Sequence, residues 1–155
     1  MIVIASVPHC GSHFTNALLT SCGVKYYSRH TYPTDMDQLL LGDDFIVPMR
    51  HPIGVAMSWK MRGKDPNDAM PFWGRLIYQI APFLPYYLPL DLPDREAWLH
   101  VLNEGMDLEL VTDWETVRGA EPRNQDAKLE AGEIVRVEKL LKDYAGFFAQ
   151  FGYRL

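Results

Sequence analysis

Two segments of the sequence combine residue types that bind anions. The first, residues 7–14 (VPHCGSHF), offers a glycine, a hydroxyl and two imidazoles close together. Gly11 lets the backbone approach a ligand, and the Ser12 hydroxyl can donate to a phosphate oxygen. His9 and His13 can donate hydrogen bonds or protons near neutral pH. These residues favour a phosphate site, although a plain strand-to-helix turn capped by Ser12 explains them equally well.

The second segment joins Arg50 to Ser58. Arg50 directly follows the apolar run Phe45–Met49, and Ser58 lies eight residues further on. A guanidinium fork binds phosphate with two parallel hydrogen bonds, and a nearby hydroxyl adds another donor. The alternatives are a surface ion pair for Arg50 and an inert position within a helix for Ser58.

Both segments follow runs that read as buried strands. Met1–Val7 and Phe45–Met49 are apolar, and each precedes a helical pattern, over His13–Cys22 and over Pro52–Arg62. Repeated strand–turn–helix units predict a three-layer α/β fold with a small, mostly parallel central sheet flanked by helices. The carboxyl ends of parallel strands share one edge, so we expect both segments to meet there.

The other expected elements are less regular. Pro48 suggests a strand end or an irregular edge. The aromatic stretch Met70–Leu92 is expected to wall an acceptor pocket, to form an oligomer contact or to cap the core. The remaining expectations are strands at Val24–Tyr27 and Leu108–Val111, a helical turn at Asp37–Leu41, helices at Ala69–Ala81, Pro93–Asn103 and Ala127–Phe151, and a polar turn at Glu115–Gln125.

Composition limits the class of protein. The 155 residues include 15 Lys and Arg against 20 Asp and Glu, a net charge of −5, which argues against nucleic-acid partners. The length suits a single domain over 1–155. Cys10 and Cys22 are too few for a disulfide scaffold or a structural zinc site, which favours a reducing, cytoplasmic setting. No apolar run is long enough to predict a signal peptide or membrane span.

In chain order, the motifs resemble those of the P-loop-type sulfotransferases that use phosphoadenosine phosphosulfate (PAPS). Residues 7–14 are similar to the loop that binds the 5′-phosphosulfate, and Arg50-His51-Pro52 with Ser58 is similar to the 3′-phosphate motif. In addition, Arg29-His30-Thr31-Tyr32-Pro33 resembles the family's Lys-Thr-His-Leu-Pro stretch, whose histidine is the catalytic base.

The resemblance implies transfer of a sulfuryl group from PAPS to an acceptor hydroxyl or amine, with PAP as the product and no metal. It casts His30 as the base and His9, with the loop N–H groups, as the group that stabilises the leaving phosphate. Arg50 and Ser58 would hold the 3′-phosphate. Its partners would be a nucleotide, an unidentified acceptor and, in an open or shared site, a second copy of the chain. The loop residues assigned to PAPS are His9, Cys10, Gly11, Ser12, His13 and Phe14.

Two departures keep alternatives open. His9 stands where the family has its loop lysine, so it would stabilise the leaving phosphate only when protonated. The interval between the two phosphate motifs is also much shorter than in typical members of the family. A degenerate module that binds a nucleotide or phosphate without turnover is therefore the main alternative. A P-loop kinase is disfavoured because no Gly-Lys-[Ser/Thr] follows the first strand. A purely structural protein is the remaining possibility.

Overall fold

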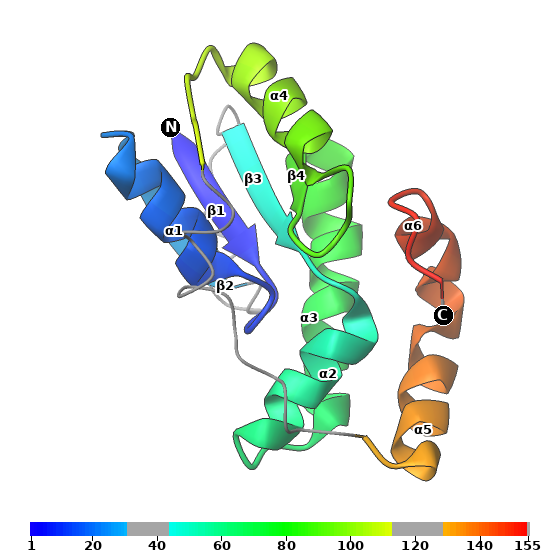
Figure 1. Cartoon of the computed structure of the whole chain (residues 1–155). Coiled ribbons are helices and arrows are strands. Elements are labelled where there is room, and N and C mark those ends of the chain that lie inside the picture. The colour runs from blue at the N-terminus through cyan, green and yellow to red at the C-terminus, as the bar shows by residue number, and fades with distance from the viewer. Residues whose placement is uncertain (31–43, 113–128, 155) are drawn as a thin grey trace.

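The structure is a computed structural model that describes residues 1–30, 44–112 and 129–154. Its centre is a four-stranded, entirely parallel sheet in the order β2-β1-β3-β4, which confirms the predicted α/β class. In Figure 1 the arrowheads of β1 and β3 lie side by side. The strands are β1 (Ile2–Ser6), β2 (Tyr26–His30), β3 (Asp44–Met49) and β4 (Tyr86–Pro89).

Helices connect the strands and cover both faces of the sheet. Pro52 lies at the first position of α2, where its missing N–H and fixed φ suit a helix start. The elements are α1 (Ser12–Ser21), α2 (Pro52–Met61), the 3₁₀ turn η2 (Pro66–Ala69), α3 (Met70–Arg75), the π-helical turn η3 (Leu76–Ile80), the 3₁₀ turn η4 (Ala81–Phe83), α4 (Arg95–Met106), α5 (Ala131–Leu141), the 3₁₀ turn η6 (Lys142–Tyr144) and α6 (Ala145–Ala149).

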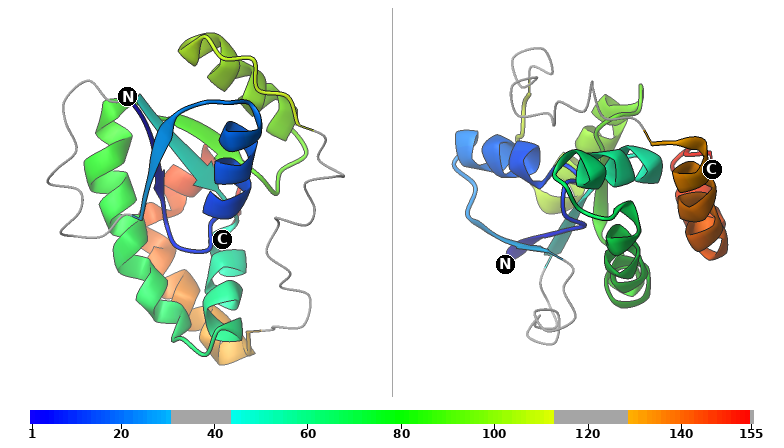
Figure 2. Two further views of the ribbon diagram at one scale, coloured as in Figure 1. Left: turned by 90° about the vertical axis from the view of Figure 1, so that its left-hand side faces the viewer. Right: turned by 90° about the horizontal axis from the view of Figure 1, so that it is seen from below.

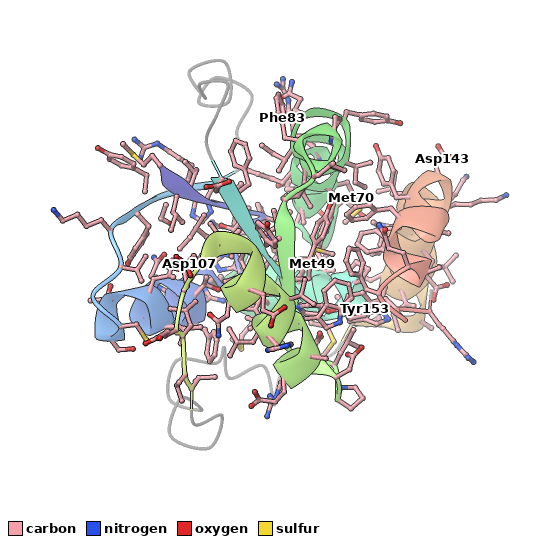
Figure 3. The ribbon with its side chains drawn as sticks, turned by 90° about the horizontal axis from the view of Figure 1, so that it is seen from above. Met49, Met70, Phe83, Asp107, Asp143 and Tyr153 are labelled. Atoms are coloured by element: carbon pink, nitrogen blue, oxygen red, sulfur yellow. The ribbon has the colours of Figure 1, made fainter. Side chains whose placement is uncertain are left out.

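Alternation along the strands divides the core into two layers. Ile4, Ile46 and Leu88 face α1 and α4, whereas Val3 and Val47 face the side covered by α2 and α3. The C-terminal helices join this second side, so α1 and α6 lie on opposite sides of the molecule (Figure 2, right). From above, side chains of α3 and the C-terminal helices meet around Met70 (Figure 3). The result is three layers, helix on sheet on helix.

Pro48 lies next to the last residue of β3, which agrees with the strand end that the sequence suggested, and it does not mark an irregular edge, because β3 lies between β1 and β4. The pairing of β1 with β3 ends at Ile4 and Ile46, two residues before Pro48, while Pro48 still pairs in register with Leu88 on β4. Proline has no N–H to donate, and here the ladder to β1 has already ended. The carboxyl ends of β1 and β3 beyond Ile4 and Ile46 therefore have no ladder between them.

The expected strand over Leu108–Val111 is absent, so that prediction was wrong. Asn103 on α4 takes the place of a partner strand for this segment. Its Nδ2 donates to the Leu110 carbonyl at 2.8 Å, and its Oδ1 accepts from the Leu110 N–H at 3.0 Å. Because one amide side chain satisfies both backbone groups, Leu110 reaches the core without joining the sheet.

Two long helices expected from the sequence are interrupted. The C-terminal one begins at Ala131, with a capping box between Glu130 and Glu133, and a 3₁₀ turn divides it into α5 and α6. The helix expected over Ala69–Ala81 runs as α3, η3 and η4. Of the described helices, none has both the length and the apolar character needed to cross a bilayer. The expectations at Asp37–Leu41 and Glu115–Gln125 lie outside the described residues.

Candidate functional site

The candidate site lies where the strand order reverses. From β1 the chain passes to β2 at one side of the sheet, and from β3 it passes to β4 at the other. In open α/β sheets, such a reversal leaves a crevice outside the carboxyl ends of the two strands, and ligands bind there. Residues 7–14 follow β1, and Arg50 follows β3. The topology thus brings the two sequence segments together.

Residues 8–11 form a compact loop between β1 and α1. His9 and Gly11 both adopt left-handed backbone conformations, with φ of 67° and 100°, and the Cys10 N–H donates to the Val7 carbonyl at 3.1 Å. Gly11, not Ser12, is the N-cap of α1, and Thr15 is the first residue whose N–H bonds back, to the Gly11 carbonyl. The first turn of a helix lies at the positive end of the helix dipole and presents backbone N–H groups along the helix axis, which favours an anion.

Gly11 is required for a reason that the sequence did not indicate. A Cβ at this position would collide with the side chain of Leu90, which follows β4. Its positive φ would also strain any larger residue. The glycine therefore allows the loop to pack against Leu90. The space beside its Cα is filled by that side chain and is not available to a ligand.

Arg50 holds the loop from the neighbouring strand. Its Nη1 donates to the His9 carbonyl at 3.2 Å, and its side chain is half-buried. A guanidinium has five N–H donors, so this single bond leaves others for a ligand. Arg50 is thus brought to the loop as expected, and it also fixes the conformation of that loop.

His30 lies on the other side of the loop, at the end of β2. It pairs in register with Ser6, and its Nδ1 is 3.3 Å from the Ser6 Oγ. Burial lowers the pKa of His30, the charges of His13 and Lys64 lower it further, and a hydrogen bond to Ser6 opposes them. His30 is therefore neutral at pH 7. In the tautomer whose Nδ1–H donates to the Ser6 hydroxyl, the Nε2 lone pair is free to accept a proton.

His9 is held in a position that disfavours its charge. Its ring packs edge-on against the Trp59 indole, with centroids 5.7 Å apart, and its buried Nε2 has no hydrogen-bond partner among the described residues. Burial, followed by the charges of Arg62, Lys64 and the two nearby histidines, lowers the pKa of His9 to about 4. The imidazole is therefore neutral near pH 7, so it brings no positive charge to the loop.

Three of the residues that the sequence assigned to the site have buried side chains. Cys10 is fully buried, and burial raises the pKa of its thiol to about 12. Phe14 packs in the core beneath α1. Ser58 is also fully buried, and its Oγ accepts from Arg62 Nη1 at 2.8 Å. In this arrangement Ser58 positions Arg62 and is not presented to a ligand, whereas His13 remains exposed beside the loop.

Sequence reasoning missed three residues around the loop, Trp59, Arg62 and Lys64. Trp59 is buried and donates its Nε1–H to the Pro8 carbonyl at 3.2 Å, so it supports the loop from below. Arg62 and Lys64 both affect the His9 pKa. The signal in the sequence was Gly63, a typical residue just after a helix end, which places its neighbours at the carboxyl end of α2.

The chain terminus closes a further side of this region. Asp91 accepts from the His51 N–H at 2.8 Å and from the Tyr153 hydroxyl at 2.6 Å. His51 caps α2 by accepting from the Ile53 N–H through Nδ1, so its Nε2–H donates to the Arg154 carbonyl at 2.9 Å. His51 thus has a structural role.

The fold and the site define an α/β protein with a cation-lined loop at the carboxyl edge of a parallel sheet. Within the described ranges, no group of three or more His, Cys, Asp or Glu side chains is arranged to hold a metal ion. A scan against protein-family models finds no matching family, and searches of curated proteins and solved structures find no match. The functional assignment therefore rests on the residues of the site.

Proposed function

We propose that this protein is a PAPS-dependent, sulfotransferase-like protein of the P-loop type, which transfers a sulfuryl group from PAPS to an acceptor hydroxyl or amine. One observation carries the proposal: Arg50, which follows β3, donates to the His9 carbonyl in the loop, and His30, at the end of β2, contacts the hydroxyl of Ser6, the last residue of β1 just before the loop. An anion at the loop would meet the N-terminus of α1 and a guanidinium, with an uncharged imidazole on the side opposite Arg50.

The proposed roles divide along this geometry. PAPS would supply the activated sulfuryl group. Arg50 would hold the 3′-phosphate, the first N–H groups of α1 would hold the 5′ group, and His30 Nε2 would accept the proton of the attacking acceptor. Such a reaction needs orientation and charge stabilisation more than covalent help. The proposal includes no metal and no nucleic acid, a cytoplasmic setting, and an acceptor site that a second copy of the chain could share.

A second candidate is a binding module of the same fold that holds PAP or another phosphorylated ligand without turnover. The neutral state of His9 favours it, because an uncharged imidazole stabilises a leaving phosphate less than a lysine does. This candidate keeps the roles of the loop and Arg50 and removes only the chemical step.

Calorimetry with PAP, followed by an acceptor screen with PAPS, tests the proposal. The wild-type chain should bind PAP, and Arg50→Met should weaken that binding about tenfold or more, since a charge-assisted contact is lost. His30→Ala should abolish turnover and leave PAP binding within about twofold.

The outcomes separate the two candidates. PAP binding without transfer to any acceptor would select the binding module. Absence of PAP binding by the wild-type chain would reject the sulfotransferase and any module that holds PAP. Full turnover in His30→Ala would remove His30 from the role of base while leaving the nucleotide site in place.

A further inference from the structure

The end of α2 places a lysine at a fixed point beside the loop. Gly63 adopts a φ of +71°, its N–H donates to the Lys60 carbonyl at 2.9 Å, and the Lys64 N–H donates to the Trp59 carbonyl at 3.1 Å. These two bonds form a Schellman motif, in which the residue after the glycine folds back over the last helical turn. The position of Lys64 therefore follows from how the helix ends.

Lys64 and the loop share one side chain, the indole of Trp59. The Lys64 Nζ lies 5.1 Å from the centre of the indole, in cation–π distance, and the His9 ring packs against the same indole. The Trp59 Nε1–H is donated to the Pro8 carbonyl, and the ring also packs against Phe72. Because Trp59 is anchored in this way, it holds the Lys64 ammonium on the His9 side of the loop.

The two cations at the end of α2 differ in how they are held. Arg62 is committed to Ser58, since its Nη1 donates to both the hydroxyl and the carbonyl of that residue. Lys64 rests on a ring face and pairs with no carboxylate among the described residues. Its charge affects both His9 and His30, so it acts on both sides of the loop. Its flexible stem allows the ammonium to leave the indole for a stronger partner.

We infer that Lys64 binds the 5′-phosphate end of the nucleotide, and that Trp59 and Gly63 position it for this role. The inference rests on the proposed function and adds to it a residue that the loop motif does not contain. The loop offers backbone N–H groups and a neutral imidazole, and no cation of its own. Lys64 provides that cation from a separate element, on a support that is itself bonded to the loop.

The test compares two nucleotides that differ only at the 5′ end, PAP and adenosine 3′-phosphate. Lys64→Met should weaken PAP binding about tenfold and leave adenosine 3′-phosphate within about twofold, because the second ligand lacks the group that Lys64 contacts. Lys64→Arg should restore most of the PAP affinity. Lys25→Met makes the same change of charge just before the amino end of β2, and both affinities should remain at the wild-type value.

Each other outcome overturns the inference. Equal losses for both nucleotides would show only a general electrostatic effect. No loss for either, with a lowered melting temperature, would show that Lys64 merely covers Trp59. If the wild-type chain binds adenosine 3′-phosphate and gains nothing from the 5′-phosphate, the inference fails while the 3′-phosphate site of the proposed function stands. If it binds neither nucleotide, the proposed function fails as well.

Discussion

At the scale of single residues, the site depends on an imidazole that is kept uncharged. His9 packs against the Trp59 indole, and its partial burial and the nearby charges of Arg62 and Lys64 disfavour the imidazolium. A bound phosphate would reverse part of that balance, since an anion beside the ring stabilises its charged form. Binding of an anion and protonation of His9 are therefore expected to be coupled.

This coupling predicts that protons are taken up when PAP binds. The pKa of His9 is about 4 in the free protein, and a bound phosphate raises it, so the complex holds more protons than the free protein at any pH between the two values. We expect PAP binding near pH 6 to take up protons at His9. Calorimetry at pH 6 in two buffers with different ionisation enthalpies measures this uptake.

The control for this prediction is His9→Asn. Asparagine tolerates the left-handed backbone of residue 9 better than most residues and does not titrate, while the ligand's own phosphate groups titrate in both proteins. The wild-type chain should take up more protons than His9→Asn. Equal uptake by the two proteins would show that His9 stays neutral in the complex.

At the scale of elements, the sequence alone predicted the parts that follow strong local rules. The apolar runs ending at Val7 and Met49, and Pro52 at a helix start, are sufficient to predict β1, β3 and α2. The parallel order of those strands then brings Arg50 to the loop, so that much of the site also followed from the sequence.

The remaining elements depend on contacts between distant residues. Strand β4 was not predicted, because Pro85 and Pro89 made its stretch read as irregular, yet it lies at the sheet's edge in the described structure, where proline is tolerated. Asn103 replaced a partner strand for Leu110, which no local pattern indicates. Ser58 read as a phosphate donor, and only the structure reveals Arg62 as its partner.

Replacing either of two helical glycines with alanine should change the stability of the protein in opposite directions. At Gly54 in α2, an added Cβ would lie 4.0 Å from an Arg50 nitrogen, an ordinary contact, whereas at Gly105 in α4 it would collide with the Tyr86 ring. Gly54→Ala should therefore stabilise the protein by about 0.5–1 kcal/mol, through the lower entropy of the unfolded chain. Gly105→Ala should destabilise it by about 1–3 kcal/mol, because Tyr86 must shift.

Urea denaturation of both variants measures these changes in the free energy of unfolding. Each variant serves as the other's control, since both replace a glycine with alanine within a helix. Stabilisation of both variants would mean that helix propensity, and not the space around the glycine, decides the effect, and destabilisation of both would contradict the prediction for Gly54.

At the scale of the whole molecule, one carboxylate ties the chain terminus to the site's edge. Asp91 joins the N-terminus of α2 to Tyr153, and His51 extends the connection to the Arg154 carbonyl. Residues that are far apart in the sequence thus meet next to Arg50. The terminus acts as a brace for the carboxyl edge of the sheet.

Tyr153→Phe removes one bond of this brace and keeps the ring. The hydroxyl donates to the Asp91 carboxylate at 2.6 Å, so its loss should lower the free energy of unfolding by about 1.5–3 kcal/mol. Tyr27→Phe is the matched control, because the Tyr27 side chain is half exposed, and it should change stability by less than about 0.5 kcal/mol. Urea denaturation at pH 7 measures both.

The same variant changes the response to alkali. Burial and the neighbouring Asp91 carboxylate raise the pKa of Tyr153 well above its usual value near 10. The unfolded chain ionises this phenol near pH 10 while the folded chain keeps it neutral, so its contribution to stability is constant below that pH and falls as the pH rises above it. Between pH 9 and pH 11, Tyr153→Phe should therefore lose less stability than the wild-type chain does. Tyr27→Phe is the control for removing a tyrosine hydroxyl, and Tyr153→Phe should also lose less stability than this control. Parallel losses in all three proteins would show that Tyr153 titrates normally and that the brace does not depend on its proton.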